Sequence, residues 1–324
     1  MNKVVVLAAL AWNLWGLSFI AIAQPQSRVS VIGLLMVSAS QKDSNIEGIR
    51  DGLRTLGHTE GQSFRFEYRT AEGHLDRLAG LAAELVRLKV DVIVCGTDAA
   101  TRAAKQATTA IPIVAILPEH DPVALGFIES FSHPGGNITG LTVRNSQLGP
   151  KRLQLLKEIV PGLTRVAVLS DSFVRAEIEA IRPAGQALGL ELQVVEVPEP
   201  FDFDAVLSSA KRQRAGALML LSSPQVYVRR LQLGTLAVQR GVPVDSPFHD
   251  LTRTGGLMSY STDVRDGFFR SAYFIDQVLK GTKPADLPFE QTANIRLIIN
   301  ARTANALHLT IPDSVLFRAD EVIR

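Results

Sequence analysis

Short apolar runs, each followed by a stretch with helical periodicity, constrain the fold more than any other feature of this sequence. Residues 29–35, 90–95 and 111–117 are almost continuously apolar, and apolar residues recur at helical spacing between these runs. A strand that is apolar on both faces is typical of a parallel sheet covered by helices on both sides. The sequence therefore predicts consecutive βαβ units and an α/β fold.

The same order of features occurs a second time along the chain. Residues 165–168 resemble residues 28–31, and each of these runs leads into a loop that contains serine. Residues 217–244 repeat the order found at 92–114, namely a strand, a polar loop, a helix and a strand with a proline. This repetition predicts two doubly wound parallel-sheet lobes of similar architecture.

The C-terminal part of the sequence adds elements to lobes that already have a full set. A strand is expected at 255–260, a long helix at 264–280 and a last strand at 295–299, after which Asn300 is placed to cap a further helix. We expect this tail to complete both lobes, so that the chain crosses between them about three times and forms a hinge. The expected boundaries are 24–143 plus 256–286 for the first lobe and 144–255 plus 287–324 for the second.

The N-terminus has the layout of a secretory signal peptide over residues 1–23. Lys3 precedes an apolar stretch from Val4 to Ile20, and the small residues Ala21 and Ala23 form a cleavage pattern. We expect cleavage after Ala23 and a periplasmic location. An uncleaved anchor helix stays open as an alternative, since the stretch is nearly long enough to span a bilayer. No later apolar run reaches that length, so we expect no membrane insertion after cleavage.

Charge and composition exclude several classes of protein. The chain has 34 Lys and Arg against 32 Asp and Glu, without a basic stripe, so we expect no nucleic-acid partner. Cys95 is the only cysteine, so no intramolecular disulfide forms. Both tryptophans, Trp12 and Trp15, lie within the expected signal peptide. We expect the mature chain to be a monomer.

The sequence carries no motif typical of a catalytic or metal centre. It lacks a Gly-x-Ser-x-Gly elbow, a Gly-x-Gly-x-x-Gly turn, a P-loop and a His-Glu-x-x-His motif. Glu119, His120 and Asp121 form the one suggestive cluster, but three adjacent residues do not converge on one metal from regular structure. We expect no enzyme activity and no cofactor, although a hydrolase on the same fold stays open because triads assemble across a fold.

Two motifs are specific in combination, HPGGNITG at 133–140 and RADEVI at 318–323. With shorter matches at 60–62, 71–73, 111–114, 121–123, 151–153 and 255–260, they resemble the ABC transporter substrate-binding protein family related to tryptophan/tyrosine-uptake binding proteins. The resemblance covers the chain from the signal peptide to the C-terminus. It implies a type I periplasmic-binding fold whose lobes close on a small-molecule ligand. It also implies delivery of the ligand to an inner-membrane ABC permease with a cytoplasmic ATPase.

Two loops depart from the family pattern, at 169–173 and at 118–121. Because both loops follow strands, we expect them to line the cleft, and the ligand's identity does not transfer from relatives. An amino acid or a related small carboxylate is the first expectation. A sugar-binding protein of the same fold is a second reading, and a periplasmic ligand sensor that partners a receptor is a third.

The site is expected beyond the carboxyl ends of the strands, where ligands bind in open parallel sheets. Thr97 fits a ligand carboxylate best, because it precedes an Ala-rich helix whose N-terminal N–H groups favour an anion, although a simple helix cap explains it equally well. Asp121 suits a ligand ammonium, with a helix start before Pro122 as the alternative. Phe173 and Phe248 suit an apolar ligand or ordinary loop packing. The candidate ligand-binding residues are Ser38, Ser40, Thr97, Asp98, Asp121, Ser170, Asp171, Ser222 and Asp245.

Overall fold

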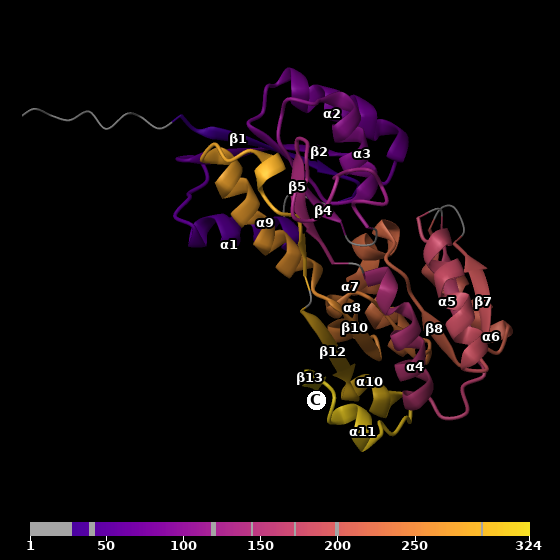
Figure 1. Cartoon of the computed structure of the whole chain (residues 1–324). Helices are drawn as coiled ribbons and strands as arrows, with labels where there is room; N and C mark the ends of the chain where they lie inside the picture. The colour runs from indigo at the N-terminus through magenta and orange to yellow at the C-terminus, as the bar shows by residue number, and fades with distance from the viewer. Residues whose placement is uncertain are drawn as a thin grey trace, which may run out of the picture.

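Two α/β lobes, each built on one sheet with helices on both faces, make up the structure (Figure 1). The computed structural model describes residues 28–38, 43–117, 121–143, 145–171, 173–197, 201–292 and 294–324. Both sheets are built mainly from parallel strands, which confirms the predicted fold class. The expected signal peptide at 1–23 lies outside the described residues.

The first lobe contains a six-stranded parallel sheet in the order β11-β5-β4-β3-β1-β2. Its strands are β1 (Ser30–Met36), β2 (Phe64–Thr70), β3 (Val92–Cys95), β4 (Ile113–Leu117), β5 (Ile138–Thr142) and β11 (Glu290–Gln291). Its helices are α1 (Ser44–Thr55), α2 (Leu78–Arg87), α3 (Asp98–Ala107) and α9 (Val264–Leu279), with the short helices η1 (Leu75–Arg77) and η3 (Pro284–Asp286).

The second lobe contains a seven-stranded sheet in the order β13-β12-β10-β9-β8-β6-β7. Its strands are β6 (Arg165–Ser170), β7 (Glu191–Glu196), β8 (Ala217–Met219), β9 (Val244–Asp245), β10 (Met258–Thr262), β12 (Ile295–Asn300) and β13 (Glu321–Ile323), of which β10 and β12 pair antiparallel. Its helices are η2 (Asn145–Leu148), α4 (Gly149–Ile159), α5 (Arg175–Ala187), α6 (Phe203–Arg212), α7 (Pro224–Gln239), α8 (His249–Thr254), α10 (Ala301–Ala306) and α11 (Asp313–Leu316). Asn300 caps α10 as predicted, since its Oδ1 accepts a hydrogen bond of 3.0 Å from the N–H of Thr303.

The apolar runs form strands that are buried on both faces. Every residue of β3 and β4 is buried. One face of this sheet packs on α1 and α9, and the other packs on α2 and α3. Helices α1 and α9 approach so closely at Gly52 that a Cβ there would lie 2.4 Å from the backbone oxygen of Phe269. Glycine at this position therefore permits two segments far apart in sequence to lie side by side (Figure 1).

The chain passes from one sheet to the other after β5, after β10 and after β11. Two boundaries therefore differ from those we assign from the sequence. Residues 258–262 form β10 in the second sheet, where Met258 pairs with Asp245, although we assign 256–286 to the first lobe. Residues 290–291 form β11 beside β5 in the first sheet, although we assign 287–324 to the second lobe. The local sequence pattern indicates strands in both segments, but which sheet each strand joins depends on its pairing with strands far away in the sequence.

A buried ion pair joins strand ends in the second lobe. Arg152 of α4 is 1% exposed, and its Nη2 lies 2.7 Å from Oδ2 of Asp245, which is fully buried at the end of β9. Nη2 also donates to the carbonyl oxygen of Leu220, just beyond β8. One guanidinium thus holds the carboxyl ends of β8 and β9 together. Burial raises the pKa of Asp245, and Arg152 opposes that shift.

We expect Asp245→Leu alone to lower the free energy of unfolding by about 3–5 kcal/mol, because it leaves the guanidinium buried without its counter-charge. The double variant Arg152→Met, Asp245→Leu removes both charges and should lie closer to the wild type. Urea unfolding of the chain from Gln24 onward measures both values. A double variant as unstable as the single one would contradict this account of the pair.

Candidate ligand-binding site

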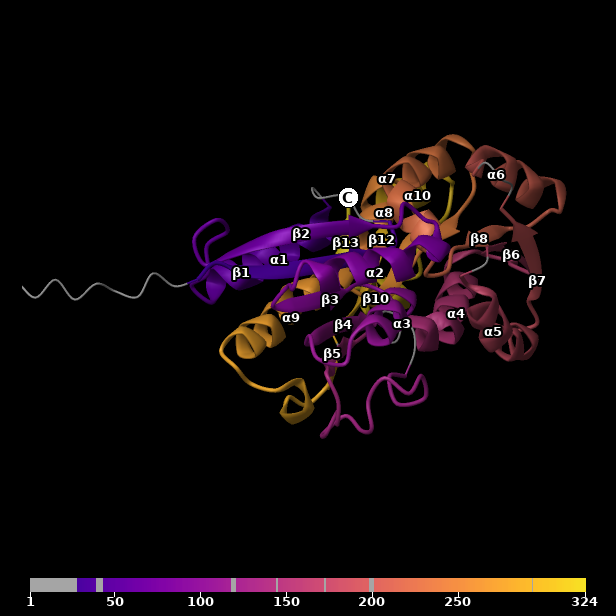
Figure 2. The ribbon, with the colours of Figure 1, turned by 90° about the horizontal axis from the view of Figure 1, so that it is seen from above.

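The carboxyl ends of strands from both sheets meet at a pocket between the lobes. Viewed from above, the strands of the first sheet run towards the second lobe (Figure 2). The pocket encloses about 590 Å³, counting the part open to solvent. It is lined by Met36, Val37, Ser38, Asn45, Gly96, Thr97, Ser222, Ser223, Pro224, Tyr227, Phe248, Val264 and Phe268.

Thr97 brings the N-terminus of α3 to the pocket from the first lobe. It stands two residues after β3 with an extended backbone, and its Oγ1 accepts a hydrogen bond of 3.2 Å from the N–H of Ala100. Thr97 is thus a helix cap and also part of the pocket wall. Because Oγ1 acts as the acceptor in the cap, the hydroxyl proton can be donated to a ligand. The dipole of α3 adds a partial positive charge at this point.

Ser223 brings the N-terminus of α7 to the same pocket from the second lobe. Its Oγ accepts hydrogen bonds of 3.0 Å and 3.3 Å from the N–H groups of Gln225 and Val226, and it donates to Oδ2 of Asp171. The neighbouring Ser222 differs, because its buried Oγ has no hydrogen-bond partner among the described residues. Ser222 therefore lines the pocket with a hydroxyl that bonds no other described residue, whereas the hydroxyl of Ser223 holds the helix and the loop.

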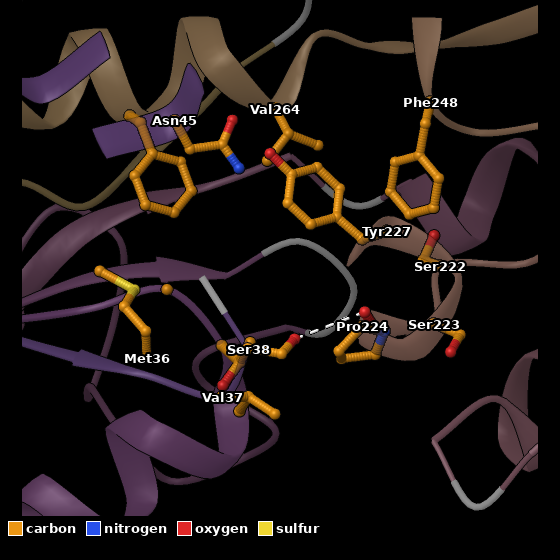
Figure 3. Close-up of a pocket in the computed structure, with 13 residues that line it drawn as sticks. Met36, Val37, Ser38, Asn45, Ser222, Ser223, Pro224, Tyr227, Phe248 and Val264 are labelled. Carbon is orange, nitrogen blue, oxygen red and sulfur yellow. Dashed lines mark hydrogen bonds between the residues drawn. The ribbon is translucent and has the colours of Figure 1, made fainter. Parts of the chain in front are cut away.

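Much of the remaining pocket wall is apolar, and five side chains form it. Figure 3 shows Tyr227, Phe248 and Val264 on one side of the pocket and Met36 on the other. The rings of Tyr227 and Phe248 pack edge to face with centroids 5.3 Å apart. Tyr227 donates from its hydroxyl to Oδ1 of Asp43 at 2.8 Å. Burial and the nearby carboxylate of Asp43 raise the pKa of Tyr227, which keeps the hydroxyl protonated. We call this part the apolar half; it consists of Met36, Tyr227, Phe248, Val264 and Phe268.

The pocket wall is polar at one end but uncharged. Within the described part of the chain, no lining residue is Asp, Glu, Lys, Arg or His. Attraction for a ligand anion therefore comes from hydroxyl groups and from the helix N-termini of α3 and α7. Such a site suits a carboxylate joined to an apolar group.

Three of the candidate residues from the sequence line this pocket, namely Ser38, Thr97 and Ser222. Asp171 does not, because it accepts hydrogen bonds from Ser223 and from the N–H of Phe173. Asp245 does not either, because it pairs with Arg152 in the interior. In both cases the acidic residue at a strand end bonds to other parts of the protein and does not face the pocket.

Three of the remaining candidates also lie away from the pocket wall. Ser170 is 1% exposed and donates to the carboxylate of Glu196. Asp121 accepts a hydrogen bond of 2.8 Å from the N–H of Val123, which is the turn-forming alternative for this residue. Asp98 is the first residue of α3, next to Thr97, and it is not part of the pocket wall. Ser40 lies outside the described residues.

Several pocket residues escape prediction from the sequence. Asn45 and Tyr227 lie in the first turns of α1 and α7, and Val264 and Phe268 lie in the first two turns of α9. The position of Tyr227 could have been inferred from the sequence. It stands four residues after Ser223, which places both residues on the same face of α7. Phe248 is the one aromatic residue here that the sequence suggests.

The two lobes contact each other around the pocket. Ser38 donates to the carbonyl oxygen of Pro224 at 3.4 Å, and Arg230 donates from Nη2 to Oγ of Ser44 at 3.2 Å. Tyr227 and Asp43 form a further hydrogen bond between the lobes. Phe173 of the second lobe also packs against the cores of both lobes. A second pocket of about 460 Å³ adjoins the first and shares Asn45, Tyr227, Phe248 and Val264 with it.

No group of three His, Cys, Asp or Glu side chains could hold a metal ion within the ranges that the structure describes. Cys95 is fully buried, and burial raises the pKa of its thiol. No helix in the described ranges is long and apolar enough to cross a membrane.

Comparisons with known proteins give one matching family and several similar proteins. The model of the family described as ABC transporter substrate binding protein matches residues 28–323. The tyrosine-binding protein of Clostridioides difficile (strain R20291) is 23% identical over 278 residues, which cover 85% of this chain and 79% of that protein. The structure of an ABC domain from Streptococcus pneumonia in complex with L-Trp has a TM-score of 0.78 and 24% identity, covering 91% of this chain and 100% of that one. A conserved domain protein from Vibrio cholerae has a TM-score of 0.79, also with 24% identity and coverage of 91% and 100%.

The adjacent serines give a matched pair of variants. Ser223→Ala should lower the free energy of unfolding without ligand by about 1–2 kcal/mol, because it removes the cap of α7 and a donor to Asp171. Ser222→Ala should change it by less than about 0.5 kcal/mol, because its hydroxyl has no partner to lose. Urea unfolding measures both. Equal losses in the two variants would contradict the assignment of roles.

Proposed function

This chain belongs to the ABC transporter substrate-binding protein family, and on that premise we propose that it is the solute-binding component of an ABC importer for an aromatic amino acid. Proteins of this family bind substrates and are not enzymes, and the same holds for this chain. The observation that carries the proposal is the pocket between the lobes, in which an uncharged polar end faces an apolar half.

The polar end suits the carboxylate of the ligand. Thr97 can donate its hydroxyl proton, and Ser222 offers a hydroxyl without a partner among the described residues. The N-termini of α3 and α7 approach from opposite lobes, so an anion between them is stabilised by both helix dipoles. A ligand held in this way touches both lobes at once.

The apolar half suits the side chain of the ligand. Tyr227, Phe248 and Phe268 offer aromatic surface, and aromatic rings pack favourably edge to face or offset. What relatives bind is in keeping with this chemistry. The relative from Clostridioides difficile is named a tyrosine-binding protein, and the structure from Streptococcus pneumonia holds L-Trp.

The transport role includes export and closure. The chain is exported with its signal peptide cleaved after Ala23, acts in the periplasm as a monomer, and delivers its ligand to an inner-membrane permease with a cytoplasmic ATPase. Closure of the lobes on the ligand is supported by the three crossings between sheets, which form a hinge. It is supported too by the hydrogen bonds of Ser38, Tyr227 and Arg230 across the lobe interface.

A dye-based thermal-shift screen of the chain from Gln24 onward tests the ligand class. At about 100 times its dissociation constant, a ligand adds roughly 2.7 kcal/mol, which raises the melting temperature of a chain this long by about 4 °C. We expect shifts of this size from aromatic L-amino acids and none from glucose, ribose or L-glutamate. Shifts from sugars alone would refute the proposal in favour of a sugar-binding protein.

Small-angle scattering tests closure. The radius of gyration should fall when the ligand saturates the protein, and Tyr227→Phe should weaken binding by about threefold to tenfold, because one hydrogen bond between lobes is lost. Tyr260→Phe is the matched control, since Tyr260 packs on the core of the second lobe and is not part of the pocket wall. An unchanged radius at saturation, or equal effects of the two variants, would count against closure through this contact.

A further inference from the structure

Asn45 lines the pocket with a buried polar side chain that has no hydrogen-bond partner among the described residues. It is 6% exposed and stands second in α1. Its backbone N–H donates to Oδ1 of Asp43 at 2.9 Å, but its carboxamide makes no hydrogen bond with any described residue. Buried side-chain polar groups are almost always paired, so an unpaired carboxamide in a binding pocket indicates a ligand atom or a water molecule as its partner.

The surroundings of Asn45 decide which part of a ligand it meets. In Figure 3 its carboxamide is turned towards the interior of the pocket, near Val264 and Tyr227. The hydroxyl groups of Ser38 and Ser222 lie on the other side of the pocket in the same view. Asn45 therefore faces the apolar half, where the side chain of a bound amino acid lies under the proposed function.

The five members of the apolar half offer little to a polar ligand atom. Met36, Phe248, Val264 and Phe268 have no strong hydrogen-bonding group. The hydroxyl of Tyr227 already donates to Asp43. The oxygen of Tyr227 can still accept a hydrogen bond, and beside it the carboxamide of Asn45 is the group that can pair with a polar atom on the ligand's ring, since it has one acceptor oxygen and two donor protons.

We propose that Asn45 determines specificity by accepting a hydrogen bond from a donor on the ligand's aromatic ring, so that the site selects a phenol O–H or an indole N–H over an unsubstituted phenyl ring. This inference rests on the proposed function and narrows its ligand class. A site built to pair with a ring donor rejects an analogue that lacks the donor, because its own polar group then stays unpaired.

Calorimetric titration with L-tyrosine, L-tryptophan and L-phenylalanine tests this role. Wild type should bind tyrosine or tryptophan at least about tenfold more tightly than phenylalanine. Asn45→Leu has nearly the same size and lacks the polar atoms, so it should reduce that preference to about threefold or less. Asn45→Ala gives a second variant if leucine disturbs the fold, as checked by the melting temperature without ligand.

Thr97→Val is the matched control, because Thr97 faces the carboxylate that all three ligands share. It should weaken all three by a similar factor of about ten and leave their ratio unchanged. If both Asn45 variants keep the preference for tyrosine or tryptophan over phenylalanine, the role of Asn45 is overturned and the proposed function stands. That result would mean that water from the adjoining pocket pairs with Asn45. Wild type that binds none of the three amino acids would overturn the proposed function, and this inference with it.

Discussion

Parallel strands that all end at one edge of a sheet force the helices that follow them to begin at that edge. In this chain the two edges face each other, so the N-termini of α3 and α7 reach one pocket from opposite lobes. The pocket contains no charged side chain among the described residues, so under the proposed function backbone dipoles and hydroxyl groups would attract the ligand's carboxylate. Because the two helices belong to different lobes, a carboxylate bound between them would tie the lobes together.

Acidic side chains near the pocket stabilise the scaffold rather than the pocket wall. Asp171 fixes Ser223, Asp245 neutralises Arg152, and Asp43 both caps α1 and accepts the hydroxyl of Tyr227. Each carboxylate holds an element that presents an uncharged group to the pocket. This arrangement keeps the pocket rigid at the strand ends while its wall stays suited to a ligand with an apolar side chain.

The fold could be predicted from the sequence because buried parallel strands leave a local signal, and so could the positions of Ser38, Thr97 and Ser222 beyond strand ends. Asp245 could not be judged, because its partner Arg152 is 93 residues away and a paired carboxylate has the same local sequence as a ligand-binding one. For the same reason the sheet to which β10 belongs depends on a pairing that periodicity does not encode. Asn45 escapes prediction because nothing in its local sequence separates it from a surface residue of a helix.

The most direct test of the account uses the ligand's own fluorescence. Both tryptophans precede residue 24, so the chain from Gln24 onward contributes no tryptophan fluorescence of its own. L-Tryptophan titrated with this protein should show a saturable blue shift as its indole enters the apolar half, whereas tryptamine, which lacks the carboxylate, should show none. Tryptamine bound as tightly as L-tryptophan would contradict a carboxylate held between the two helix N-termini.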